Sequence, residues 1–254
     1  MTETISSPQN PRFKQLKKLV DSAVSRREQG QTLLDGEHLL AAALDAGIRP
    51  ALIITTPIEP PSPVLARCAN VERLVLGQGL FNALSPVKNP TGILALIDIP
   101  QPQLPAKSDF CVLLETIQDP GNLGAMLRSA AAAAVDAVYL SPGCADAWSP
   151  KVLRGGMGAH FATHIIEDAD LPAVAQSFPG AVCAATLGAA HSLYQTDLRG
   201  AVAFAVGNEG AGLSAELRAA AGVEFAIPMP GRVESLNAAA ALAVCLFERV
   251  RQAG

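Results

Sequence analysis

The sequence predicts an α/β protein of two domains, the second built on a parallel β-sheet with helices on both faces. Three observations support this prediction. Half of the 254 residues are hydrophobic, which is enough to bury two modest cores. Residues 98–108 carry three prolines among polar residues, as a semi-extended linker does. After that segment, short apolar runs alternate with helical stretches, which is the pattern of a parallel sheet.

The chain before the linker predicts a compact α/β domain at residues 1–98. A basic amphipathic helix is expected at residues 12–27 and a second helix at residues 36–46. Apolar runs predict strands at residues 51–55, 73–76 and 92–97. We place the linker at residues 99–108, so the second domain takes residues 109–254.

The second domain alternates strands with helices. Strands are expected at residues 110–114, 137–140, 181–185, 201–206 and 223–227. Helices are expected at residues 121–135, 171–178, 214–221 and 234–250. Ligands of such sheets bind beyond the carboxyl ends of the strands. We therefore expect a site in the loops that follow Leu114, Ala185, Val206 and Ile227.

Positive charge is concentrated near the start of the chain. The whole chain has a formal net charge of −4, which by itself argues weakly against a nucleic-acid partner. Residues 1–30, however, hold six basic residues against three acidic ones. The basic residues are Arg12, Lys14, Lys17, Lys18, Arg26 and Arg27. Charge alone leaves two interpretations open, an RNA contact and a solvated helix face.

The cysteines and histidines predict neither disulfides nor a metal site. The five cysteines are odd in number and never form a Cys-x-x-Cys pair, so we interpret them as buried thiols of a reducing compartment. His160 and His164 have the spacing of a helical metal-ligand pair, but the residues around them favour a strand. We expect no metal.

The sequence also predicts a cytoplasmic protein without a membrane partner. Residues 1–10 have neither the basic nor the apolar segment of a signal peptide. The longest apolar run, residues 238–247, is too short to cross a bilayer.

Two of the predicted loops combine a turn with unusual polar residues. The loop after Leu114 opens a helix near Asn122 and places Arg128 on its second turn, which on its own suggests a helix cap and a surface arginine. The loop after Val206 has three glycines between Gly207 and Gly212, which allow backbone N–H groups to approach a ligand closely. A tight turn without a ligand remains the alternative, since neither a dinucleotide fingerprint nor a P-loop is present.

The loop after Ile227 leads into an apolar helix. It reads Pro-Met-Pro-Gly-Arg-Val-Glu-Ser-Leu-Asn and ends at Asn237. The helix that follows is apolar almost all round, so we expect it to be buried on every side, in the core or against another subunit.

Taken together, these loops closely resemble the three motifs of the SpoU/TrmH class of SPOUT methyltransferases. The residues that carry the resemblance are Asn122-x5-Arg128, Gly207-Asn-Glu-Gly-x-Gly-Leu-Ser214 and Ile227-Pro-Met-Pro-Gly-x-Val-x-Ser-Leu-Asn237. Asn10-Pro-Arg-Phe-Lys14, Leu34-Asp-Gly-Glu-His38 and Pro90-Thr-Gly-Ile-Leu94 resemble the ribosomal-protein-like RNA-binding domain often fused to these enzymes. The chain departs from the family at the alanines of residues 238–241 and at Gly156, where a serine is expected.

The resemblance implies a fold, a cofactor and a partner. Family members fold the second domain into a deep trefoil knot that holds S-adenosylmethionine (SAM), and they form homodimers through the last helix. The resemblance implies SAM contacts at Leu187, Gly188, Gly207, Glu209, Ile227, Met229, Ser235, Leu236 and Asn237. It implies catalytic roles for Asn122, Arg128, Glu209, Ser235 and Asn237.

The activity implied is SAM-dependent methylation of a ribose 2′-OH in structured RNA, with ribosomal RNA expected first and transfer RNA second. Only RNA offers this hydroxyl. The family often assigns the role of base to the residue matching Arg128, but arginine stays protonated in proteins. We therefore expect Arg128 to orient the target phosphate and hydroxyl. The RNA contacts expected are Arg12, Lys14, Lys17, Lys18, Arg26, Arg27, Lys151 and Arg154.

Two other functions remain open from the sequence. One is an RNA-binding protein whose catalytic domain has decayed, against which the intact loop residues argue. The other is a nucleotide-dependent enzyme such as a dehydrogenase, which lacks its phosphate-binding fingerprint here.

Overall fold

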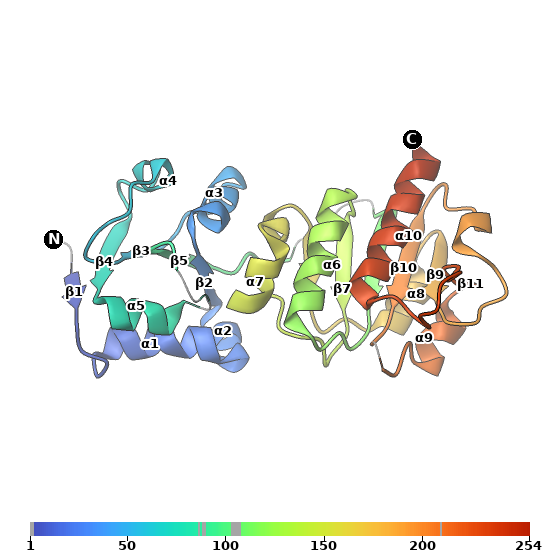
Figure 1. Ribbon diagram of the computed structural model, residues 1–254, viewed down its shortest axis with the longest axis horizontal. Helices are drawn as coiled ribbons and strands as arrows, with labels where there is room; N and C mark the ends of the chain where they lie inside the picture. The colour runs from blue at the N-terminus through green and yellow to red at the C-terminus, as the bar shows by residue number, and fades with distance from the viewer. Residues whose placement is uncertain (1–2, 86, 88–89, 103–107, 209) are drawn as a thin grey trace. The chain divides into compact units, whose positions relative to one another are not determined.

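The computed structural model describes residues 3–85, 87, 90–102, 108–208 and 210–254 (Figure 1). Contacts divide the chain into two compact units. The first holds Met1–Gln101 with Trp148–Phe161, and the second holds Pro102–Ala147 with Ala162–Gly254.

The first unit is a mixed five-stranded sheet with the order β1-β4-β3-β5-β2. Its strands are β1 (Glu3–Ile5), β2 (Gln31–Asp35), β3 (Leu52–Thr55), β4 (Glu72–Leu76) and β5 (Ile93–Asp98). Its helices are α1 (Pro11–Asp21), α2 (Ala23–Gln29), α3 (Glu37–Asp45), α4 (Pro63–Ala66), α5 (Gln78–Leu84) and α7 (Pro150–Gly156). Strand β5 is antiparallel to both β2 and β3, and the other pairs are parallel. The predicted α/β character of this part is confirmed.

The basic helix expected at residues 12–27 is two helices. Ser22 is extended, and its hydroxyl accepts a hydrogen bond from the N–H of Ser25, so it caps α2. Arg26 corrects the predicted set of RNA contacts, because its side chain is only 4% exposed. Its guanidinium donates to the carbonyl oxygens of Leu19 and Val20 at the end of α1. Arg26 is therefore a buried capping residue.

Trp148–Phe161, which the sequence placed in the second domain, packs with the first unit. Helix α7 contacts β2, and the Thr32 hydroxyl donates to the carbonyl oxygen of Trp148 at 2.7 Å. Gly158 has φ +93°, and a β-carbon there would lie 2.8 Å from that of Ala42. The close approach of the segment after α7 to Ala42 of α3 therefore requires glycine at this position. His160 lies in a 3₁₀ turn and His164 opens a strand, so the pair does not have helical spacing.

The second unit is a six-stranded parallel sheet with the order β11-β9-β10-β6-β7-β8. Its strands are β6 (Phe110–Leu114), β7 (Ala137–Leu140), β8 (His164–Ile166), β9 (Ala181–Ala185), β10 (Val202–Val206) and β11 (Val223–Phe225). Its helices are α6 (Pro120–Ala132), α8 (Leu171–Ser177), α9 (Ala215–Ala220) and α10 (Ala238–Ala253). The predicted parallel sheet is confirmed, while the trefoil knot stays a prediction.

Helices cover both faces of this sheet, as the sequence predicts. Alternate strand residues such as Cys111 and Ala203 pack in one cluster with Leu171 of α8 and Leu217 of α9. Phe110, one residue out of phase with Cys111, lies under the guanidinium of Arg249 from α10, 4.9 Å from its ring centroid. Helix α10 therefore lies on the opposite face, where it packs beside α6 (Figure 1).

The last helix begins at Ala238 rather than at residue 234, because Asn237 caps it. Within this chain Phe247 is 49% exposed and Val250 is 38% exposed, so the core covers only part of the helix and its burial against another subunit stays a prediction. Among the described residues, no helix is both long and apolar enough to cross a membrane.

The interpretation of the cysteines as unpaired packing residues is confirmed. All five are free thiols, and only Cys144 is partly accessible. Burial raises the pKa of Cys183 to about 11 and that of Cys245 to about 12, so both stay protonated and unreactive at neutral pH.

Candidate active site

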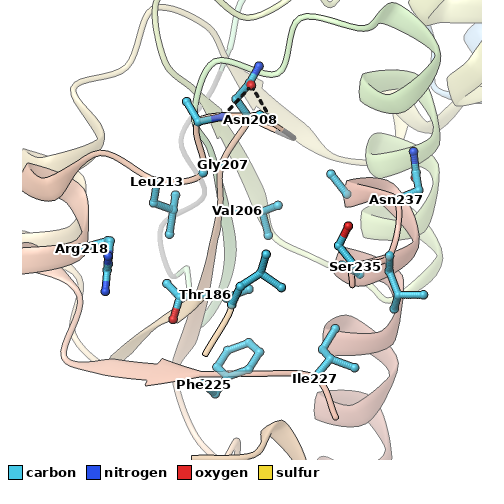
Figure 2. A pocket seen from close by; sticks show the side chains of 18 of the residues that line it. Thr186, Val206, Gly207, Asn208, Leu213, Arg218, Phe225, Ile227, Ser235 and Asn237 are labelled. Atoms are coloured by element: carbon cyan, nitrogen blue, oxygen red, sulfur yellow. Dashed lines mark hydrogen bonds between the residues drawn. The ribbon is translucent and has the colours of Figure 1, made fainter. Parts of the chain in front are cut away.

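A cavity of about 540 Å³ opens at the carboxyl edge of the second sheet (Figure 2). Its walls come from the ends of β9, β10 and β11 and from the loops that follow them. The lining residues are Ala185, Thr186, Leu187, Val206, Gly207, Asn208, Gly210, Ala211, Gly212, Leu213, Arg218, Phe225, Ile227, Met229, Ser235, Leu236, Asn237, Ala238 and Ala241. The volume is in the range of small-molecule sites, about 300–1,000 Å³. The cavity lies where parallel sheets bind ligands.

Polar side chains tie the glycine loop after β10 to the loop after β6. The side-chain amide of Asn208 donates to the carbonyl oxygen of Thr116 at 3.0 Å, and its oxygen accepts from the N–H of Gly210 at 2.8 Å. The N–H of Ser214 donates to the Glu115 carboxylate at 2.7 Å. Both ends of the loop are therefore fixed to the neighbouring strand's loop.

The glycine loop folds back on itself, and this requires glycine at its first position. The N–H of Gly212 donates to the carbonyl oxygen of Asn208 at 2.8 Å. A β-carbon on Gly207 would lie 2.2 Å from the carbonyl oxygen of Gly212. Any other residue at 207 would force the loop to move.

Asn237 joins the third loop to the helix of the first. Its side-chain oxygen accepts from the N–H groups of Ala239 and Ala240 at 3.0 and 3.2 Å, so it caps α10. Its side-chain nitrogen donates to the Asn122 side-chain oxygen at 2.9 Å. Two of the residues predicted to be catalytic, 115 positions apart in the sequence, are thus in direct contact at the rim of the cavity.

Arg128 lies away from this contact. Helix α6 begins at Pro120, after the capping residue Asp119, so Arg128 is on the third turn and not on the second as predicted. Its side chain is exposed, and within the described chain it makes no hydrogen bond or ion pair. Arg128 is not among the described residues that line the cavity.

Most of the residues expected to contact the cofactor line the cavity. They are Leu187, Gly207, Ile227, Met229, Ser235, Leu236 and Asn237. Gly188 is not among the described lining residues and turns the chain with φ +79°. Glu209 lies outside the described residues.

Sequence reasoning missed a charged group on the cavity wall. The Arg218 guanidinium donates to both carboxylate oxygens of Glu224, at 3.1 and 2.9 Å. The Thr186 hydroxyl also donates to Glu224, at 3.2 Å. These contacts, Arg218 first, lower the pKa of Glu224. No sequence signal separates Arg218 from an ordinary helix arginine, whereas Asn208 could have been found from its place between a buried strand and the glycines.

The cavity suits a ligand with an uncharged ring and a polar remainder. Phe225, Ile227 and Leu236 provide apolar wall, and Gly207 and Gly212 bring backbone close to the interior.

Comparison with known proteins identifies the family. Residues 109–247, more than half of the chain, match the family described as SpoU rRNA Methylase. The chain belongs to the SpoU rRNA methylase family. Residues 10–95 match a domain described as MRM3-like substrate binding domain. The resemblance drawn from the three loops is therefore confirmed, and the N-terminal motifs lie in a substrate-binding domain, whose binding of RNA stays a prediction.

Relatives of this SpoU methylase are RNA methyltransferases by name. It is 37% identical over 98% of its length to an uncharacterized tRNA/rRNA methyltransferase of Synechocystis, of which the match covers 94%. It is 32% identical over 96% of its length to the 23S rRNA (guanosine(2553)-2′-O)-methyltransferase RlmP of Bacillus subtilis, of which the match covers 97%. The crystal structure of an AdoMet-bound rRNA methyltransferase from Sinorhizobium meliloti matches 98% of both chains, at 27% identity with a TM-score of 0.86.

Proposed function

We propose that this SpoU methylase transfers a methyl group from SAM to a ribose 2′-OH of ribosomal RNA. The observation that carries the proposal is the Asn237–Asn122 contact at the rim of an apolar cavity, in a chain of this family. The name of the B. subtilis relative supports both ribosomal RNA and the 2′-oxygen, and a bacterial rRNA enzyme supports a cytoplasmic location. The Synechocystis relative keeps transfer RNA as the second candidate substrate.

The residues of the cavity fit SAM in size and chemistry. Its volume of about 540 Å³ holds a molecule of this class. Apolar side chains such as Phe225 and Ile227 offer a surface for the adenine ring, and the glycine loop offers backbone groups. SAM supplies a methyl group bonded to a positively charged sulfur. We expect Leu187, Gly207, Ile227, Met229, Ser235, Leu236 and Asn237 to hold it.

The protein's own contribution to the reaction is alignment and exclusion of water. Such transfers gain most from correct placement of the two reacting groups. Asn122 and Asn237 fix the rim of the cavity through one hydrogen bond. Arg128 is exposed on the same helix as Asn122, and it is available to hold an RNA phosphate and the target hydroxyl.

The activity is tested by calorimetric titration with SAM, followed by tritiated methyl transfer to total RNA and nuclease digestion. We expect saturable binding and label in a 2′-O-methyl nucleoside. Absence of SAM binding would support an RNA-binding protein without catalysis, and label on a base would overturn the assigned acceptor.

The chain forms a homodimer through α10 in this proposal. Within this chain, Ala240, Phe247 and Val250 leave an apolar stripe of the helix exposed, at spacings of seven and three residues. A second copy would bury this stripe against its own. The arrangement would also let Arg128 of one chain hold the RNA substrate beside the cavity of its partner.

Phe247→Asp is expected to convert the dimer to a monomer and to lower methyl transfer at least tenfold, because it places a charge in the apolar stripe. Sedimentation equilibrium measures the first effect. Val24→Asp, at an apolar side chain 61% exposed on α2, is the matched control and should remain dimeric. A wild-type protein that is monomeric and active would rule out a site in which Arg128 of one chain acts at the cavity of its partner.

The first unit supplies the RNA contacts in this proposal. Lys14, Lys18 and Arg27 are exposed, and within the described chain none of them has an acidic partner. Arg12 and Lys17 are exposed only in part and pair with acidic side chains, Arg12 with Glu3 and Glu72 and Lys17 with Asp21. Lys151 and Arg154 are exposed on α7 and so belong to the same unit.

Replacing Lys14, Lys18 and Arg27 together by alanine is expected to weaken RNA binding uniformly across sequences. The magnitude of the slope of log K against log salt concentration should fall by about two. Each lost phosphate contact lowers this slope by roughly 0.7–0.9. Filter binding at several salt concentrations measures both quantities. Lys17→Ala is the control, and an unchanged slope in the triple variant would place the RNA contacts elsewhere.

A further inference from the structure

A charged pair forms one wall of the cavity. Arg218 comes from α9, Glu224 from β11, and Thr186 follows β9. Arg218 and Thr186 line the cavity, and both donate hydrogen bonds to the Glu224 carboxylate behind them. Of the described residues that line the cavity, Arg218 is the one with a charged side chain. We call Thr186, Arg218 and Glu224 the charged wall.

The charged wall is separated from the rim where transfer is expected. Figure 2 shows Ser235 and Asn237 on one side of the cavity and Arg218 on the other. Asn237 is the residue bonded to Asn122, so the reacting methyl group is expected on its side. A part of the ligand that takes no part in the chemistry must therefore face Arg218.

SAM has one part whose charges match this wall. Its adenosine part is uncharged at neutral pH, whereas its amino-acid part carries a carboxylate and an ammonium group. An arginine has five N–H groups, and the contacts of Arg218 with Glu224 use two of them. The remaining N–H groups are available to a second carboxylate, for which the guanidinium is the best-matched partner.

The ion pair contributes little to folding where it lies. The Arg218 and Glu224 side chains are 49% and 36% exposed, and pairs this exposed contribute little to stability. What the pair does provide is a fixed direction for the guanidinium, since both carboxylate oxygens hold it. A pre-oriented charge loses less freedom when a ligand binds.

We propose that the charged wall binds the amino-acid part of SAM, with the carboxylate on Arg218, which lines the cavity, and with Glu224 behind it holding the guanidinium in place. The inference rests on the proposed function and assigns one end of the same ligand. A wall that already holds both signs of charge stays neutral overall when it binds a zwitterion. The adenosine part is left to the apolar wall of Phe225, Ile227 and Leu236.

Truncated ligands test this assignment by calorimetry on the full chain. S-adenosylhomocysteine keeps the amino-acid part, and 5′-methylthioadenosine lacks it. Arg218→Ala should weaken binding of S-adenosylhomocysteine by roughly 10–100-fold, the effect of losing a hydrogen-bonded charge, and leave 5′-methylthioadenosine within about twofold. Arg199→Ala removes a similar exposed arginine–carboxylate pair, with Asp197, and should change neither.

A second ligand separates the two charges. Decarboxylated SAM keeps the ammonium but lacks the carboxylate. The wild-type preference for SAM over this ligand should disappear in Arg218→Ala and persist in reduced form in Glu224→Gln, which keeps the arginine but removes the charge that orients it. Thermal unfolding of each variant checks that it is folded.

The outcomes are distinct. Equal weakening of S-adenosylhomocysteine and 5′-methylthioadenosine by Arg218→Ala would move the charged wall to the adenosine end and overturn the inference. Unchanged binding of both ligands by Arg218→Ala would show that the charged wall does not contact SAM. A wild-type chain that binds none of these ligands would overturn the proposed function itself.

Discussion

Arg128→Ala is expected to lower methyl transfer to RNA about 10³-fold while the affinity for SAM stays within about twofold of wild type. Removing a group that stabilises charge at the reacting atoms typically costs 10²–10³-fold or more in rate. Arg128 is not among the described residues that line the cavity, which is why cofactor binding should persist. Single-turnover transfer of a tritiated methyl group and calorimetry with SAM measure the two quantities separately.

Arg128→Lys tests whether the arginine acts through its positive charge alone or through its planar set of hydrogen-bond donors. Lysine keeps the positive charge but lacks the planar set of donors, so we expect it to recover only a small part of the activity. Arg199→Ala, at an exposed arginine of the same unit, is the matched control. An active Arg128→Ala enzyme would remove this residue from the mechanism.

Gly207→Ala is expected to abolish SAM binding, with a loss of affinity of about a hundredfold or more. The added methyl group would lie 2.2 Å from the carbonyl oxygen of Gly212, a distance that no backbone contact tolerates. The glycine loop must then open, and its hydrogen bond between Gly212 and Asn208 is lost. We expect the free energy of unfolding to fall by about 1–3 kcal/mol as well.

Calorimetry with SAM and urea unfolding measure these effects. Gly222→Ala is the control, because a β-carbon there meets no atom within 4 Å and its φ is not in the left-handed region. Its stability should stay within about 0.5 kcal/mol of wild type. A Gly207→Ala protein that binds SAM normally would show that the loop adjusts without cost and is not shaped for the ligand.

Local sequence patterns predicted every strand of the second sheet except β8, which is only three residues long, and they predicted the loops that line the cavity. β6 and β10 are buried at every position, so each appears in the sequence as a continuous apolar run with sharp ends. The glycines after Val206 were informative for a steric reason. The backbone approaches so closely at Gly207 that no other residue type fits there. The family resemblance implied roles for Asn122 and Asn237, but neither it nor any local pattern predicted that the two side chains are in contact.

Features that depend on long-range packing could not be predicted. In the sequence nothing distinguishes Arg26 from its neighbour Arg27. Arg26 is buried only because its guanidinium meets the carbonyl groups at the end of α1. The break at Ser22 had a signal, because serine is a preferred capping residue, but the surrounding helical periodicity hid it. Arg218 and Glu224 are only six residues apart, but their pairing depends on the turn between α9 and β11, for which the sequence has no recognisable signal.

The packing of Trp148–Phe161 with the first unit bears on how such a chain can be modified or evolve. The sequence cannot be divided into two modules at residues 99–108, because α7 packs on β2 and the Thr32 hydroxyl donates to the carbonyl oxygen of Trp148, in a unit built mostly from residues 1–101. An exchange of the N-terminal part for that of another enzyme would leave α7 facing a foreign β2. If the first unit binds RNA as proposed, new RNA specificities should arise by paired changes in both stretches of sequence, or by transfer of the two together.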